Sequence, residues 1–183
     1  MEDFWNDRPN EVKEQGHFEI MRTPAGGVLS GVITSDTFVG CNLHYYRGRS
    51  TPCRKNDCEA CEAGHRPRWT GYVLLMSRKT RRVNILEFTA RCYSTMQSML
   101  IAKTSLRGVV VTVKRTSSRP NGPLAMTFEE DRVDPDSLPP APDLREILER
   151  IWEVKEKQIP MNFERESAIK KNGKPTSQKS KNR

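Results

Sequence analysis

The sequence predicts a mainly β fold, a five-stranded barrel with one helix between its third and fourth strands. The best strand candidate, residues 69–76, is apolar on both faces, as a central strand would be. It returns through a polar turn into a second apolar run at 83–92, which predicts a β-hairpin. The apolar period then becomes helical over 93–106, before β-rich runs at 109–114 and 124–129.

The first strand is expected to be long and bent. Residues 17–46 alternate in an extended pattern that several glycines interrupt, and Gly48 can end the strand. A polar loop, 47–68, then leads to the second strand. This order is that of an OB-type barrel, which binds oligonucleotides across its second and third strands and the flanking loops. A small α+β sandwich is the alternative.

The chain divides into a central domain and flanking segments. We expect an N-terminal arm at 1–16, an OB-like nucleic-acid-binding domain at 17–132 with a zinc loop at 44–66, a Pro-rich linker at 133–142, a helix at 143–158 and a basic, disordered tail at 159–183. Asp143 and Glu146 have the spacing of a helix-capping box. The apolar stripe of that helix must pack either on the barrel or on a partner.

Length and composition narrow the possible classes. A chain of 183 residues suits one domain with tails. It has no 18-residue apolar run and no basic-then-apolar leader, so we expect no membrane partner and a cytoplasmic, not secreted, protein in the nucleoid or in a phage-infected cell. Five cysteines in such a chain favour metal binding over a disulfide framework.

Charge is strongly segregated along the chain. The net charge is +8 overall, but residues 44–115 carry 15 basic and 4 acidic side chains, whereas 1–43 and 116–169 are net acidic. The same basic segment holds all four tyrosines. Cations that neutralise phosphates, interleaved with rings that stack on bases, are typical of a surface for single-stranded nucleic acid.

A cysteine cluster is the strongest local signal. Cys53, Cys58 and Cys61 have the spacing C-x4-C-x2-C, which supplies most of a tetrahedral zinc site. His44 is the favoured fourth ligand because, at a strand end, it would pin the loop to the sheet. His65 and Cys41 are the alternatives. We predict a structural Zn²⁺ and no catalytic role, since no zinc-enzyme motif occurs.

The cluster and its surroundings resemble a known family. The order of His44, Cys53 and Cys58-x2-Cys61 within an OB-like run of strands resembles the helix-destabilising, single-stranded-DNA-binding proteins of T-even phages, in which one His and three Cys hold a structural zinc. The stretch from His44 through Trp69-Thr-Gly-Tyr72 is similar to small mobile-element and phage proteins of bacteria. The resemblance covers 17–130 and implies a role in DNA replication or recombination. The basic C-terminus differs from the acidic tail with which such proteins usually end.

The predicted function is therefore sequence-tolerant binding of single-stranded DNA, with RNA as a possible ligand. Candidate base-stacking residues are Tyr45, Tyr46, Trp69 and Tyr72, although Trp69 and Tyr72 must face opposite sides of their strand. Candidate phosphate contacts are Arg47, Arg49, Arg54, Lys55, Arg66, Arg68, Arg78, Lys79, Arg81 and Arg82, with Arg91, Arg107, Lys114 and Arg115 as secondary candidates. The alternative function is an adaptor in a replication, recombination or transposition complex, which would dock partners through the zinc loop and the C-terminal helix.

Overall fold

The computed structural model describes residues 18–152. The predicted N-terminal arm and basic tail, the last residues of the predicted C-terminal helix and His17 lie outside this range. The strands are β1 (Ile20–Met21), β2 (Val28–Ile33), β3 (Val39–Tyr46), β4 (Arg49–Pro52), β5 (Arg68–Met76), β6 (Val83–Thr89), β7 (Val109–Arg115) and β8 (Leu124–Arg132). The α-helices are α1 (Glu59–Glu62), α2 (Tyr93–Lys103) and α3 (Leu144–Ile151), and short 3-10 turns are η1 (Lys55–Asp57), η2 (Ala90–Cys92) and η3 (Pro135–Ser137).

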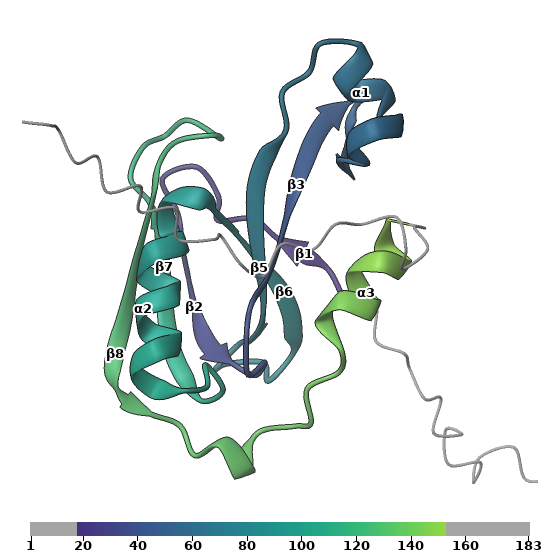
Figure 1. Ribbon diagram of the computed structural model, residues 1–183. Helices are drawn as coiled ribbons and strands as arrows, with labels where there is room; N and C mark the ends of the chain where they lie inside the picture. The colour runs from purple at the N-terminus through teal and green to yellow at the C-terminus, as the bar shows by residue number, and fades with distance from the viewer. Residues whose placement is uncertain (1–17, 153–183) are drawn as a thin grey trace, which may run out of the picture.

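The predicted order of the main strands and of the helix between them is confirmed. The long first strand is present as β2 and β3, with an interruption at 34–38. Both halves pair with β5, where Ile33 lies opposite Leu75 and Gly40 opposite Gly71. The predicted hairpin is β5–β6, and α2 connects it to β7, which lies between β2 and β8. Figure 1 shows α2 beside this sheet.

The fold is mainly β as predicted, but the sheet does not close into the predicted five-stranded OB-like barrel. The eight strands form one mixed sheet in the order β1-β6-β5-β2-β7-β8, with β3 and β4 to the side, and β6 does not pair with β8. Instead β1 lies parallel to β6, with Ile20 opposite Ile85 and Met21 opposite Leu86. Because β5 occupies the other edge of β6, these residues of β6 have no free edge for β8. The N-terminal segment thus takes the place where closure would occur.

Strand β5 is buried on both faces, as its apolar sequence predicted. Val73 and Leu75 lie in a core that α2 covers, together with Phe88, Met96 and further residues of β2, β7 and β8. Tyr72 and Leu74 lie in a second core on the opposite face, with residues of β3, β6 and α3. A strand between two apolar layers cannot show the alternation of a half-exposed strand.

The C-terminal helix packs on the sheet. Leu144, Ile147 and Leu148 of α3 are buried against the second core, and Trp152 contacts the ring of Tyr72 edge to face at 5.7 Å between centroids. Asp143 caps the helix by accepting from the backbone N–H groups of Arg145 and Glu146, as predicted. Of the two alternatives for the apolar stripe, packing on the sheet is therefore the one observed. None of the helices in residues 18–152 is long and apolar enough to cross a membrane.

The loop before β5 contains more structure than the sequence predicted. Strand β3 turns at Arg47 and Gly48, both with positive φ, and pairs back with β4. Two consecutive left-handed residues are typical of a type I′ hairpin turn. We call residues 44–67 the cysteine arm. Figure 1 shows it projecting from the end of the sheet, with α1 at its tip and away from α2.

Candidate functional site

Four side chains of the cysteine arm converge on one point. The ligand atoms of His44, Cys53, Cys58 and Cys61 all lie within 4.8 Å of one another. Sγ of Cys61 lies 3.3 Å from Nε2 of His44 and 3.6 Å from Sγ of Cys53. Two ligands about 2.3 Å from a tetrahedral metal ion would lie roughly 3.8 Å apart, so this spacing fits one bound ion. The predicted set of four ligands is brought together.

Local backbone structure places each ligand. His44 lies on β3 opposite Thr51, and Cys53 follows β4 with its N–H donated to the carbonyl of Asn42. Cys58 is the N-cap of α1, and Cys61 lies one turn further along that helix. The hairpin therefore presents His44 and Cys53, and the single turn of α1 presents the C-x2-C pair. The arrangement joins both parts of the arm.

The thiols of the cluster differ in acidity. Burial disfavours the thiolate of Cys58, but backbone hydrogen bonds from Cys61, Arg54 and Ala60 hold the pKa of Cys58 below its usual value. Desolvation, hydrogen bonds with Cys53 and Cys58 and repulsion by their negative charge raise the pKa of Cys61 to about 12. Ionisation of Cys61 beside its neighbours is therefore unfavourable unless a cation compensates the negative charge, and a divalent metal ion would do this.

The alternatives for the fourth ligand are placed elsewhere. His65 is exposed and packs its ring edge to face on Tyr46, with 5.1 Å between centroids. Cys41 is buried in the second core, where burial and then the charge of Glu87 raise its pKa to about 12. His44 is buried, and its Nδ1 has no hydrogen-bond partner within residues 18–152. Its Nε2, which faces Cys61, is the atom available to a metal ion.

Three thiols and one imidazole fit a first-row transition metal ion. Calcium and magnesium prefer oxygen ligands, whereas sulfur and nitrogen ligands in a compact tetrahedral set are typical of zinc and related ions. All four positions of such a site would be filled by protein. The residues of the cluster thus match a structural, not an open, metal site.

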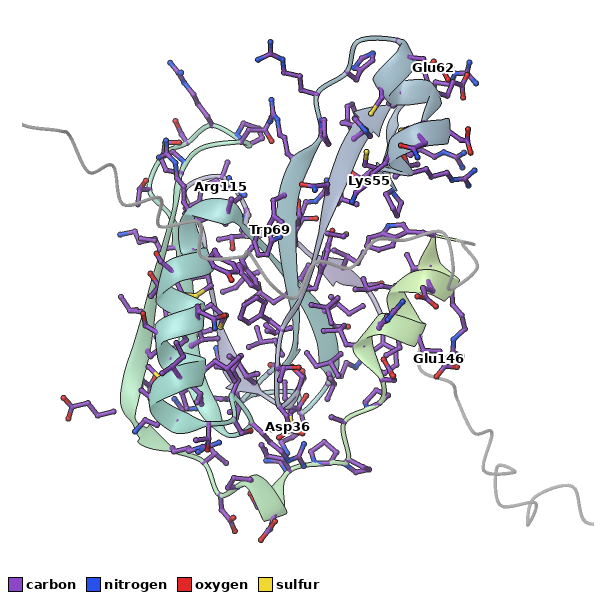
Figure 2. All side chains as sticks on the ribbon, in the orientation of Figure 1. Asp36, Lys55, Glu62, Trp69, Arg115 and Glu146 are labelled. Atoms are coloured by element: carbon purple, nitrogen blue, oxygen red, sulfur yellow. The ribbon has the colours of Figure 1, made fainter. Side chains whose placement is uncertain are left out.

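A basic cleft lies beside the cysteine arm. It has a volume of about 1250 Å³ and runs between the arm and the 116–123 loop, over the ends of β5 and β6. Its basic side chains are Arg22, Arg66, Arg68, Arg91 and Arg115, and Glu87 is the one carboxylate among the residues that line it. Figure 2 shows Trp69 and Arg115 between the arm and α2, at this end of the sheet. The cleft is where the charge and the aromatic residues of the basic segment meet.

Four of the main predicted nucleic-acid-binding residues line this cleft, namely Tyr45, Arg66, Arg68 and Trp69, and so do the secondary candidates Arg91 and Arg115. Tyr45 is 69% exposed. Trp69 is partly buried and packs edge to face on Phe88 and Tyr93, and its indole covers Gly40 so closely that a Cβ there would collide with it. Tyr45 is therefore free to stack, whereas Trp69 offers only part of its ring.

Tyr72 was wrongly predicted to stack on bases. Its side chain is 1% exposed and lies under Trp152 in the second core. Burial, and next the negative charge of Glu87, raises the pKa of its hydroxyl well above the usual value. The opposite orientation of Trp69 and Tyr72 follows from the alternation of a strand.

The remaining predicted contacts do not line the cleft. Arg78, Lys79, Arg81 and Arg82 belong to the β5–β6 turn, which lies at the other end of the nine-residue β5, roughly 25 Å from the arm. Arg78 there forms an ion pair with Glu129 at 3.3 Å. Tyr46, Arg47, Arg49, Arg54 and Lys55 lie on the arm outside the cleft lining. Arg47 pairs with Glu59 and lies over the ring of Tyr46. The cations do not form one continuous surface around the hairpin.

Two arginines of the cleft have roles that the sequence did not reveal. Arg22 was not among the candidates because it lies in the N-terminal segment, outside the basic stretch. It donates to Glu87 at 3.0 Å and to Ser50 at 3.1 Å. Arg115, a secondary candidate, is 7% exposed and donates to the carbonyls of Thr23 and Gly122. Its guanidinium therefore fixes the 116–123 loop and is not available to a phosphate.

Comparison of the chain with models of protein families, with curated proteins and with solved structures finds no match. What stands is a mainly β protein with a Cys₃His cluster that could bind a metal ion.

Proposed function

We propose that this protein is a non-enzymatic, sequence-tolerant single-stranded-DNA-binding protein with a structural zinc ion. The observation that carries the proposal is the composition of the cleft, in which one carboxylate and four arginines besides the buried Arg115 accompany Tyr45 and Trp69. Arginines attract the phosphate backbone and release its counterions, while exposed rings stack on unpaired bases. The cleft lies between the arm and the 116–123 loop, and in chain order these two segments correspond to the loops that flank the binding face of OB-type folds.

Single strands suit this surface better than duplex DNA does. Tyr45 can stack only on a base whose face is exposed, and such stacking contributes about 1–3 kcal/mol for each base without a sequence requirement. The available arginines come from the segment after β1, from the arm, from the start of β5 and from η2, so they surround a path instead of forming a flat face. A flexible strand can follow such a path.

The zinc ion would act by shaping the cleft. His44, Cys53, Cys58 and Cys61 would hold it, and Arg66 at the end of the arm and Arg68 at the start of β5 follow shortly after them. A bound ion would compensate the thiolate charge and fix the short helix α1 against the β3–β4 hairpin. One wall of the cleft would then depend on the metal.

The adaptor function has less support. An adaptor that docks partners through the C-terminal helix needs an available apolar stripe, but Leu144, Ile147 and Leu148 are already buried against the sheet. The exposed end of the stripe is Ile151, which is 41% exposed. The cysteine arm remains as the docking element that the adaptor function would use.

Fluorescence anisotropy with labelled oligo-dT, oligo-U and duplex DNA over a salt series tests the proposal. We expect tight, salt-dependent binding to oligo-dT and weak binding to the duplex. The double variant Arg66→Glu/Arg68→Glu should lose at least tenfold in affinity and flatten the salt dependence, because each lost phosphate contact lowers the slope by about 0.7 for a single strand.

Lys79→Glu/Arg82→Glu is the matched control. It also reverses two charges, at exposed positions in the β5–β6 turn at the far end of β5, and should leave affinity within about twofold. Equal affinity for oligo-dT and duplex would overturn the proposal. Stronger binding of oligo-U than of oligo-dT would assign the protein to RNA instead.

A further inference from the structure

Glu87 is unusual among the residues of the cleft because it carries the one negative charge of the lining. It lies on β6 opposite Tyr72, and the next pair towards the cleft on the same face is Thr70 with Thr89. Its side chain is 19% exposed. A carboxylate at this recessed position lies at the floor of the cleft.

Arg22 holds this carboxylate in place. Nε of Arg22 donates to Oε2 of Glu87 at 3.0 Å, and the other end of the same guanidinium donates to Ser50 on β4 at 3.1 Å. Oε1 of Glu87 has no hydrogen-bond donor among residues 18–152. The carboxylate is thus oriented from one side, which leaves Oε1 and the second lone pair of Oε2 as acceptors for a ligand.

A negative charge does not attract phosphates, whereas a carboxylate that Arg22 orients can accept hydrogen bonds from the edge of a base. An ionised carboxylate only accepts hydrogen bonds. Guanine presents two adjacent donors, N1–H and the N2 amino group, which match the two oxygens of a carboxylate. Thymine presents a single N3–H between two carbonyl oxygens. Those oxygens are acceptors, as the carboxylate is, so they would repel it.

We propose that Glu87 gives the cleft a preference for guanine at one position of a bound single strand. The inference rests on the proposed function and refines it. Most nucleotides of the strand would be bound through charge and stacking, and one base would be recognised through a pair of hydrogen bonds. Unpaired bases are commonly recognised at their Watson–Crick edge in this way. A bidentate pair discriminates against the wrong base by roughly tenfold or more.

The test compares an oligo-dT of about fifteen nucleotides with the same strand carrying one central guanine. The wild-type protein should bind the guanine strand roughly tenfold more tightly. Inosine in place of guanine lacks the N2 amino group, so it should lose most of the gain. This comparison needs no variant and is independent of any effect on folding.

Glu87→Gln should bind both strands alike, because an amide offers one acceptor and one donor in place of two acceptors. Glu129→Gln is the matched control, since Glu129 pairs with Arg78 outside the cleft; it should keep the preference. Equal binding of the two strands by the wild type, or a preference that survives in Glu87→Gln, would overturn the inference while leaving the proposed function intact. Failure to bind either strand would instead overturn the proposed function.

Discussion

Sγ of Cys61 lies 3.3 Å from Nε2 of His44, although the two residues are 17 positions apart and belong to different elements. The type I′ turn at Arg47 and Gly48 sends the chain back along β3, so α1 returns to the end of that strand. A metal ion bound between His44 and the three cysteines would join the tip of the arm to the sheet.

Replacement of His44 by Ala should abolish metal binding. We expect about one zinc ion per chain in the wild type and almost none in His44→Ala, because three thiolates without the imidazole leave the tetrahedral site open. Metal content by mass spectrometry and the thermal midpoint before and after chelation measure this. His65→Ala, the matched control, should keep its metal. Loss of zinc in His65→Ala but not in His44→Ala would contradict the geometry of the cluster.

Truncation of Leu148 should destabilise the whole domain. Its side chain is completely buried between α3 and the sheet, so Leu148→Ala leaves a cavity and should cost about 2–5 kcal/mol of unfolding free energy. Ile151 belongs to the same helix but is 41% exposed, and Ile151→Ala should cost under about 1 kcal/mol. Urea unfolding measures both. Similar small losses in both variants would show that α3 is not part of the cooperative unit.

The sequence was informative where the pattern is local. The two-sided apolar run of β5, the helical period of α2 and the capping residue Asp143 each identify an element through its own residues. The ligand set was accessible for the same reason, since C-x4-C-x2-C lies within nine residues and His44 lies near the end of β3. Chemistry that is encoded over short spacings can be inferred without a structure.

Long-range arrangement was not accessible. The residue pattern of the two-residue strand Ile20–Met21 does not predict that this strand pairs with β6. That pairing prevents closure of the barrel. The basic residues of the β5–β6 turn are close in sequence to those of the arm, yet the length of β5 separates them. Arg22 joins the cleft only because the chain crosses from β1 towards β2 at that end of the sheet. Such placements depend on topology, which composition does not reveal.

Arg107 should be essential for attaching the Pro-rich segment. Its guanidinium donates to the carbonyl oxygens of Thr34, Pro135, Leu138 and Pro139, at 2.6 to 3.1 Å. Arg107→Ala leaves these acceptors without that donor and should cost roughly 2–3 kcal/mol. Arg145→Ala, which removes an i,i+4 pair with Glu149, should cost under about 0.5 kcal/mol.

Chemical denaturation of both variants, together with proteolysis of the 133–142 segment, measures the effect. Arg107→Lys should recover little, because an ammonium group cannot serve carbonyls spread around a planar guanidinium. Full recovery in Arg107→Lys would show that charge, and not the fork of donors, attaches this segment to the end of β2.

Stability should fall in alkaline solution because of the second core. Burial raises the pKa of Cys41 from 9.0 to about 12 and also raises that of Tyr72. Above pH 9 the unfolded chain releases the Cys41 proton while the folded chain retains it, so the unfolded state binds fewer protons and the free energy of unfolding decreases as pH rises. The stabilisation is complete below pH 9 and is lost between pH 9 and 12, at up to about 1.4 kcal/mol per pH unit for this group. Urea unfolding of the zinc-loaded protein between pH 8 and 11 measures the slope, and Cys41→Ala should reduce it by about one proton. An unchanged slope in that variant would show that Cys41 is not protected from ionisation by the packing of α3 on the sheet.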